Sequence, residues 1–427
     1  MIKGLLTSKL FLESAFYGSA TAINRGLVLL ALPFLGSFLT IEEYGIWTLS
    51  QVLISLIAPV LCLNGSAGIM REGANDRDLG FSIFVKYVRL ATKIAFVVCI
   101  VSVFLKGDWI LYTIYLTLLE AYLTLLISFY RSQDKHSLYF IAVLTKLVAL
   151  FIAIYFSKTH DSLISLLQYQ LAFGVGLLAP LFTLTLLNDR LKSLKYEFSP
   201  VVIFSLNLLP HGIAQWILSG SDRLIIKSIL GDSQLGYYSL AYTLSMSVML
   251  VNSGLGMTIP VEIIRNYSRW VETDRRSRII LAYSILFLFI SIGLMVTCLE
   301  LKNNVPFLKD FNDVVAITMI WVLNGMYFLG IYLFYVNYLF YLRKSLQVSF
   351  LTAGAAIINI ILTVWLVNLF GIEGAAVSTC ISYLIYMGLT MGFANHLQAF
   401  PKRYFIFDMV VIGATASLNY FILRLIV

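Results

Sequence analysis

Charged residues within otherwise apolar stretches are the part of this sequence that could do chemistry. Arg25, Glu120, Lys146 and the adjacent Asp222 and Arg223 each lie inside a long run of apolar residues. An arginine or lysine at the centre of a membrane helix costs about 2.5 to 3.5 kcal/mol, so such residues usually face a bundle interior or a wet cavity and mark the path of a substrate or ion. These five residues are therefore the candidate site residues.

Depth along the helices indicates which of these residues can meet. At about 1.5 Å of rise per residue, Glu120 lies about 21 Å and Lys146 about 18 Å from the turn at Asp134, and Arg25 lies about 20 Å into its own helix. All three can share one layer. Glu120 and Lys146 can form an ion pair, which either only fixes the packing or belongs to a site. Glu120 and Asp222 are also candidates for titrating or coordinating a coupling ion.

Arg25 has no obvious local partner, and a cation near the midplane attracts an anion that a substrate can supply. Arginine suits phosphate because its planar guanidinium donates two parallel hydrogen bonds, whereas lysine acts as a point charge. Arg223 and Lys227 lie four residues apart on one helical face, and Asp222 can hold either of them in place. Lys227 also fits a snorkelling position near the interface.

The elements that must position these residues are membrane helices. The chain of 427 residues is 60% hydrophobic and 12% charged, whereas soluble domains average roughly 25% charged residues. A spanning helix needs about 20 mostly apolar residues. Thirteen segments meet this criterion: 12–38, 44–68, 82–105, 109–130, 138–157, 163–187, 200–229, 236–260, 279–300, 312–341, 346–370, 374–396 and 404–426. The sequence predicts an all-α polytopic membrane protein of 12 to 13 transmembrane helices.

The placement of lysine and arginine predicts the orientation. With the N-terminus in the cytoplasm, 21 of the 30 basic residues fall on the cytoplasmic side, as the positive-inside rule requires. This accounts for the net charge of +8 without nucleic acid binding. The longest external loop, Leu301 to Phe311, leaves no room for a catalytic domain, and no Walker, HExxH or GxSxG motif occurs. We expect no enzyme activity, no cofactor and no metal site.

The cytoplasmic segment Asn188 to Pro200 divides the helices into two halves. We predict an N-terminal lobe at residues 1–192 with helices one to six, a C-terminal lobe at residues 193–400 with helices seven to twelve, and an additional C-terminal helix at residues 401–427. A weak repeat supports the division, because residues 44–49 and 235–240 both place a glycine and an aromatic residue after a short external loop, at an offset of 191 residues. Both halves then enter the membrane in the same direction, as parallel repeats do.

Three segments carry a family resemblance: residues 32–47, 220–239 and 359–376, which include Tyr44-Gly45-Ile46-Trp47 and Gly374-Ala375-Ala376. Together with the topology they resemble the polysaccharide flippases of the Wzx type, the O-antigen and related translocases, in the superfamily of multidrug, oligosaccharidyl-lipid and polysaccharide exporters. The resemblance implies two six-helix lobes that form a V-shaped central cavity and rock to alternate access. The family usually has twelve or fourteen helices, so the thirteenth segment departs from it and leaves the side of the C-terminus open.

The substrate that the resemblance implies is an undecaprenyl-pyrophosphate-linked oligosaccharide, moved from the inner to the outer leaflet of the bacterial cytoplasmic membrane. The implied cationic, substrate-binding cavity falls on Arg25, Lys146 and Arg223 of this chain. Expected partners are the lipid-linked oligosaccharide, membrane lipids, the polysaccharide polymerase machinery, and H⁺ or Na⁺ if transport is ion-coupled. The membrane potential alone can also drive export of an anion, with about 2.3 kcal/mol per charge per 100 mV.

Two other functions compete with this interpretation. A drug or small-molecule cation antiporter of the same superfamily would favour intramembrane acids, whereas Arg25 and Lys146 favour an anionic substrate. A membrane polysaccharide polymerase or glycosyltransferase would need catalytic residues on a sizeable external loop, which this sequence does not contain.

Overall fold

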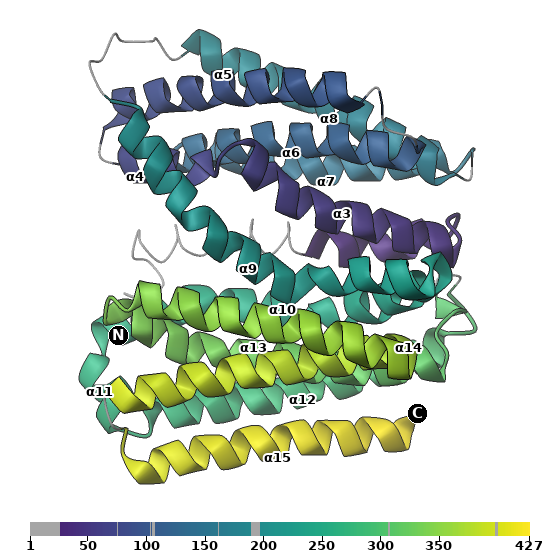
Figure 1. Cartoon of the computed structure of the whole chain (residues 1–427). Helices are drawn as coiled ribbons and strands as arrows, with labels where there is room; N and C mark the ends of the chain where they lie inside the picture. Colours follow the sequence, from purple (N-terminus) through teal and green to yellow (C-terminus); the bar gives the residue numbers. More distant parts are fainter. Residues whose placement is uncertain are drawn as a thin grey trace. The chain divides into compact units, whose positions relative to one another are not determined.

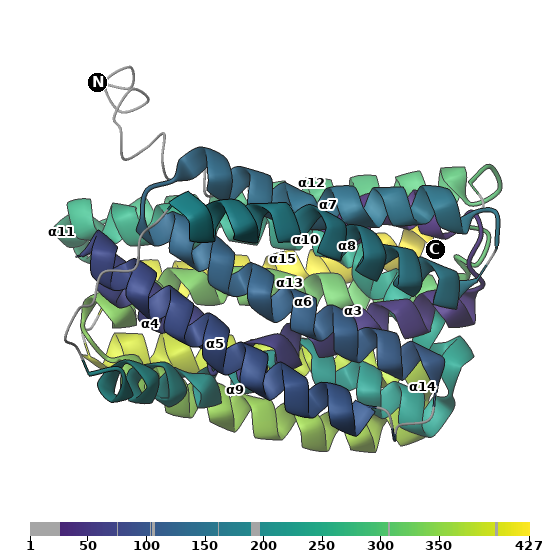
Figure 2. The same cartoon turned by 90° about the horizontal axis from the view of Figure 1, so that it is seen from above.

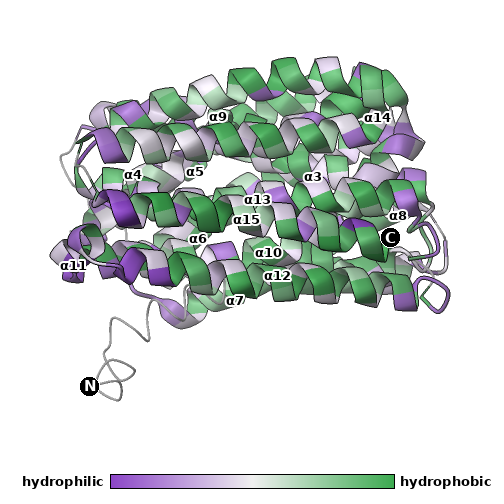
Figure 3. Cartoon of the chain, turned by 90° about the horizontal axis from the view of Figure 1, so that it is seen from below, coloured by the Kyte–Doolittle hydropathy of each residue, from purple (hydrophilic) through white to green (hydrophobic). Residues whose placement is uncertain are grey.

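The computed structural model describes residues 26–74, 76–102, 104, 107–160, 162–188, 197–305, 308–397 and 400–427. These ranges consist of helices joined by turns and short irregular segments, and they contain no strand. Among them, ten helices are long and apolar enough to cross a membrane (Figure 1). Hydrophobic residues run along the helices while hydrophilic ones gather at helix ends and loops (Figure 3). The prediction of an all-α polytopic membrane protein is confirmed.

The helices follow the thirteen predicted segments. A helix at Gly26–Leu35 falls within the first segment, and the labelled helices are α3 (Ile41–Leu61), α4 (Gly65–Gly73), α5 (Arg77–Ser102), α6 (Asp108–Ser132), α7 (His136–Ser157), α8 (Leu163–Asn188), α9 (Ser199–Leu230), α10 (Asp232–Arg265), α11 (Tyr267–Glu272), α12 (Arg275–Leu301), α13 (Asp313–Tyr341), α14 (Ser345–Leu397) and α15 (Lys402–Ile426). α14 unites two predicted segments across a kink at Gly371, whose φ of 60° and ψ of −139° are not helical.

The second predicted segment, 44–68, is divided between α3 and α4. Pro59 lies in the last turn of α3, and the two residues before α4, Leu63 and Asn64, have positive φ angles of 49° and 51°. Gly65 then begins α4 against the ring of Tyr87, and a Cβ there would lie 2.5 Å from that ring. A proline near the end of the helix and a glycine that permits close packing therefore replace the continuous helix that hydrophobicity alone predicts.

The described residues form two compact units, which are Phe38–Ile213 and Ala214–Val427 together with residues 26–37. Residues 197–213 thus group with the unit Phe38–Ile213, and residues 401–427 group with the other unit. The division into an N-terminal lobe at 1–192, a C-terminal lobe at 193–400 and an additional helix at 401–427 stays a prediction.

Helix α6 is the centre of the unit Phe38–Ile213. It packs against α3, α4, α5, α7 and α8 (Figure 2). Aromatic rings fill the space between α5 and α6, where Phe84 stacks on Phe129 with centroids 4.7 Å apart. Glu120, at the middle of this helix, is half-buried, with its side chain 21% exposed.

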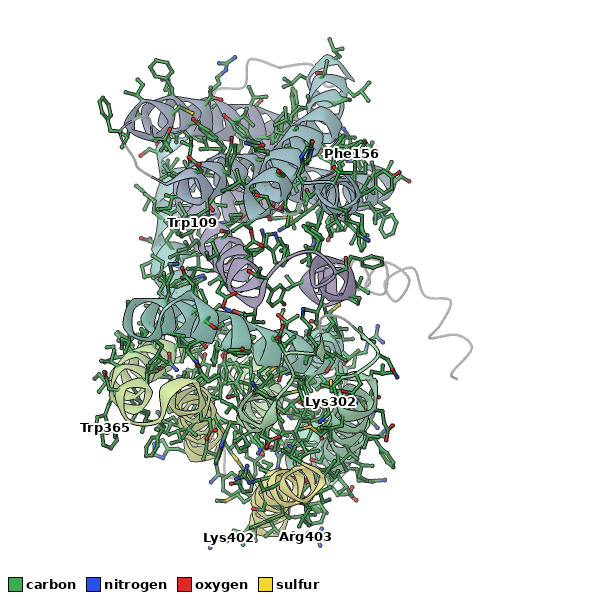
Figure 4. All side chains as sticks on the ribbon, turned by 90° about the vertical axis from the view of Figure 1, so that its right-hand side faces the viewer. Trp109, Phe156, Lys302, Trp365, Lys402 and Arg403 are labelled. Atoms are coloured by element: carbon green, nitrogen blue, oxygen red, sulfur yellow. The ribbon has the colours of Figure 1, made fainter. Side chains whose placement is uncertain are left out.

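Helix α13 has the corresponding place in the other unit, where it packs against α10, α12, α14 and α15. The thirteenth predicted segment, α15, is an integral part of this unit because its polar residues are paired inside it. Asp408 accepts hydrogen bonds from Arg276 Nε and from Tyr335 Oη, both at 2.9 Å. In contrast, Lys402 and Arg403 at the start of α15 and Trp365 of α14 project outward (Figure 4).

Candidate functional site

Glu120 and Lys146 form an ion pair between the midpoints of α6 and α7. Lys146 Nζ lies 3.1 Å from Glu120 Oε1, and the two side chains are 22% and 21% exposed. Counting residues from the turn at Asp134 predicts that the two charges can meet, and the structure brings them together. The pair is accessible in part, because each side chain keeps about one fifth of its surface exposed.

A small cavity surrounds this pair. Its volume is about 30 Å³, and its polar lining consists of Gln51 from α3, Glu120 from α6, Thr145 and Lys146 from α7, and Gln170 from α8. A water molecule needs at least about 10 to 15 Å³ of such space. The cavity therefore admits water and is too small to enclose a pyrophosphate.

Asp222 and Arg223 form the second intramembrane pair, on α9. Arg223 Nη1 lies 3.7 Å from Asp222 Oδ1, and both residues are buried, at 4% and 2% exposed. The guanidinium of Arg223 stacks 4.1 Å from the centroid of the Tyr242 ring, and Tyr238 donates a hydrogen bond to Asp222. Neighbouring aromatic side chains thus enclose the pair.

The sequence left open which basic residue Asp222 holds, and the geometry decides the question. Asp222 pairs with Arg223, whereas Lys227 pairs with Asp232 at the start of α10. Arg25, the third predicted cation, lies outside the described residues. In the described part of the chain, Lys146 and Arg223 are therefore each neutralised by a carboxylate from this protein.

A buried hydrogen-bonded network beside the second pair was not predicted from the sequence. Tyr386 Oη donates to Tyr332 Oη at 2.6 Å, and Gln215 Nε2 donates to Tyr386 Oη at 3.1 Å. Asn359 contacts Ser382 at 3.2 Å between α14 residues on the two sides of the kink. Uncharged polar residues are common in membrane helices, so the sequence carries no signal that singles these out.

The buried ion pair of Arg276 and Asp408 was also missed. The sequence places Arg276 with the cytoplasmic basic residues, whereas the structure buries it at 1% exposed and holds its guanidinium 4.0 Å from the Phe400 ring. An aspartate inside an apolar segment is the signal that could have found Asp408. Among the described residues, no group of three or more His, Cys, Asp or Glu side chains is arranged to hold a metal ion.

Comparison with known proteins identifies the family of this chain. Residues 34–255, just over half of the chain, match the family described as polysaccharide biosynthesis protein. The chain belongs to this family. No curated protein matches the sequence significantly.

Solved structures of membrane transport proteins share the fold of this chain. The lipid II flippase MurJ in its inward closed conformation is similar with a TM-score of 0.69 and 13% identity, over 96% of this chain and 98% of MurJ. An inward-facing multidrug resistance MATE family transporter of the MOP superfamily is similar with a TM-score of 0.56 and 14% identity, over 92% of this chain and 96% of the transporter. At such identities the likeness is one of fold alone.

Proposed function

We propose that this chain is a flippase that translocates an undecaprenyl-pyrophosphate-linked oligosaccharide repeat unit by alternating access. It moves the repeat unit from the inner to the outer leaflet of the bacterial cytoplasmic membrane, for O-antigen or other surface polysaccharide synthesis. The observation that carries the proposal is the match to the polysaccharide biosynthesis family over residues 34–255. A membrane-embedded member of that family with an exporter fold is suited to moving a polysaccharide intermediate across the membrane.

The chemistry of the substrate assigns the roles of the charged residues. A pyrophosphate needs cations, a sugar needs a wet cavity, and a prenyl tail can remain in lipid. In this proposal Arg25, Lys146 and Arg223 bind the pyrophosphate, and Glu120 and Asp222 neutralise Lys146 and Arg223 while no substrate is bound. The 3.1 Å pair at Lys146 supports a closed resting state, which the substrate opens by competing with Glu120.

Export of an anion requires no ATP. An inside-negative potential contributes about 2.3 kcal/mol per outward negative charge per 100 mV. Glu120 or Asp222 would carry the coupling ion, H⁺ or Na⁺, if transport is ion-coupled. In this proposal the N-terminus lies in the cytoplasm, and the polysaccharide polymerase machinery acts on the outer side, where the repeat unit arrives.

The experiment is flipping of a labelled undecaprenyl-pyrophosphate oligosaccharide in proteoliposomes. Native protein should flip the substrate, and Arg25→Ala and Lys146→Ala should reduce flipping at matched insertion. Lys158→Ala is the matched control, because Lys158 is exposed at the end of the same helix as Lys146 and should leave flipping unchanged. Loss of flipping in the control as well would contradict the assignment of Lys146 to the substrate site.

A drug or small-molecule cation antiporter is the second candidate, because MATE transporters share the fold. Proteoliposomes that extrude cationic drugs against an ion gradient but flip none of several lipid-linked oligosaccharides would favour it. Formation of polymerised sugar by the purified chain would instead support a polymerase or glycosyltransferase.

A further inference from the structure

The exposed face of α5 carries two cations beside large apolar side chains. Arg89 and Lys93 are exposed and lie four residues apart, so they project from neighbouring turns of one helical face. Phe96 and Val97 continue this face and are 69% and 58% exposed. Apolar side chains exposed on a membrane helix contact lipid, because lipid tails are the solvent there. We call Arg89, Lys93 and the exposed Thr92 between them the α5 patch.

The packing of α5 against α6 determines how deep the α5 patch lies. The ring of Phe84 stacks on Phe129 with centroids 4.7 Å apart, and Thr92 Oγ1 lies 2.9 Å from Tyr122 Oη. These contacts show that the two helices pack antiparallel, so a step forward on α5 is matched by a step back on α6 (Figure 2). Lys93 is therefore level with the midpoint of α6, which spans residues 108–132.

This level corresponds to the middle of a membrane. Helix α6 is long and apolar enough to cross a bilayer, so its midpoint lies near the centre of the hydrocarbon core. Arg89 lies about 6 Å from this level, at about 1.5 Å per residue, toward the end of α6 that the sequence predicts to be cytoplasmic. The sequence groups both cations with the cytoplasmic basic residues, and only the packing of α5 on α6 shows their depth.

Among the described residues, no carboxylate forms an ion pair with these two cations. The ion pairs of the described residues in the unit Phe38–Ile213 are Arg71 with Glu72, Arg77 with Asp134, and Lys146 with Glu120. A lysine can extend toward the interface, but the half-thickness of the hydrocarbon core is about 15 Å, which exceeds the length of its side chain. A cation at the depth of Lys93 therefore needs a counter-charge from its surroundings.

The chemistry of that counter-charge follows from the α5 patch and the side chains next to it. An arginine donates two parallel hydrogen bonds to a phosphate, and a lysine one turn away adds a second positive charge. The exposed rings and branched chains at Phe96 and Val97 suit acyl chains. A phospholipid presents a phosphate beside acyl chains, and basic groups on membrane helices bind anionic phospholipids.

We infer that the α5 patch binds the phosphate of an anionic phospholipid and draws this headgroup toward the middle of the bilayer. The lipid comes from the leaflet nearer Arg89, which is the cytoplasmic leaflet in the predicted orientation. Both basic side chains can extend toward that leaflet, which shortens the distance that the phosphate must move. Local thinning of the bilayer beside α5 is the expected consequence, since charges within membranes are accommodated in this way. The inference stands on α5 and α6 and does not depend on the proposed function.

Photocrosslinking in liposomes tests the position of the headgroup. The full chain is reconstituted with phosphatidylglycerol that carries a photoactivatable group on its headgroup, and adducts are mapped by mass spectrometry. Adducts should appear at residues 89–93. Half-maximal labelling should require roughly thirty-fold more probe in the double variant Arg89→Gln with Lys93→Gln, which corresponds to about 1 kcal/mol for each basic residue. Lys93→Arg keeps the charge and should keep the labelling, which separates loss of charge from misfolding.

The matched control is the double variant Lys402→Gln with Arg403→Gln. It removes two exposed basic residues at the start of α15 (Figure 4) and should leave the labelling of α5 unchanged. Adducts confined to loops and helix ends would overturn the inward position of the headgroup. Labelling at residues 89–93 that needs the same amount of probe in the α5 double variant would overturn the role of the two cations. Equal labelling by a phosphatidylcholine probe with the same reactive group would overturn the preference for an anionic lipid.

Competition separates this site from the proposed transport substrate. Excess unlabelled phosphatidylglycerol should suppress the labelling of α5. If a prenyl pyrophosphate suppresses the labelling and phosphatidylglycerol does not, the bound phosphate belongs to the transport substrate and the phospholipid site is overturned. Labelled α5 in a chain that flips no lipid-linked oligosaccharide supports the phospholipid site and contradicts the flippase. Flipping without labelling of α5 contradicts the phospholipid site and leaves the flippase intact.

Discussion

The two intramembrane ion pairs of this protein are built differently. Glu120 and Lys146 come from two helices, are about one fifth exposed and border a cavity. Asp222 and Arg223 are consecutive on one helix, almost fully buried, and in contact with Tyr238 and Tyr242. A pair that joins two helices beside a cavity can separate when a substrate or proton competes for it, whereas a pair enclosed by aromatic side chains is suited to a fixed electrostatic role. If the proposed function holds, the pair that changes during transport is therefore expected to be Glu120 with Lys146.

The largest effect should come from breaking the enclosed pair. Arg223→Ala leaves Asp222 buried without its cation, and removing one partner of a buried pair costs roughly 3 to 5 kcal/mol. We expect a correspondingly large loss in the free energy of unfolding, measured by denaturant titration in mixed micelles. If Arg223→Ala unfolds like the native protein, the enclosed pair does not stabilise the unit.

A smaller loss of stability should follow from breaking the accessible pair. Lys146→Ala removes a charge-assisted hydrogen bond of about 1.5 to 3 kcal/mol, and part of this loss is recovered because water reaches Glu120. The exchange Glu120→Lys with Lys146→Glu should restore most of the stability, as a double-mutant cycle measures. The corresponding exchange of Asp222 and Arg223 should not, because Tyr238 donates to a carboxylate at position 222. Equal rescue at both pairs would contradict the comparison.

Tyr238→Phe tests the aromatic enclosure itself. It removes the hydroxyl that donates to Asp222 and leaves the ring in place. Hydrogen bonds between membrane helices average about 0.6 kcal/mol and reach about 1.7 kcal/mol, so we expect a loss in that range from the same denaturant titration. Tyr237→Phe, on the adjacent half-buried residue of α10, is the control and should change stability less.

The smallest effect is expected at the pair of Lys227 and Asp232, whose side chains are 27% and 41% exposed. Exposed ion pairs contribute about 0 to 1 kcal/mol. Lys227→Gln should therefore change the unfolding free energy by less than about 1 kcal/mol and should leave flipping in proteoliposomes unchanged. A loss of flipping in this variant would indicate that the substrate passes close to Lys227.

Most of the helical architecture could be predicted from the sequence, because the length of an apolar run is a local property. The predicted segments 109–130 and 138–157 correspond to α6 and α7. The meeting of Glu120 and Lys146 could also be predicted, since a short turn joins their helices and the rise per residue is constant. Pro59 and the glycines of α4 were visible in the sequence, but hydrophobicity alone does not show that they divide the second segment.

By itself, the sequence determined that this is a helical membrane protein and that Glu120, Lys146, Asp222 and Arg223 lie within its helices, since both follow from local composition. Only the tertiary structure decided the partners of those charges. Arg276 pairs with Asp408 across 132 residues, and Gln51 and Gln170 join Glu120 and Lys146 from two further helices. These contacts depend on how helices far apart in the chain pack against each other, which no local pattern encodes. The same packing decided that Arg223 is enclosed and that Lys146 is accessible.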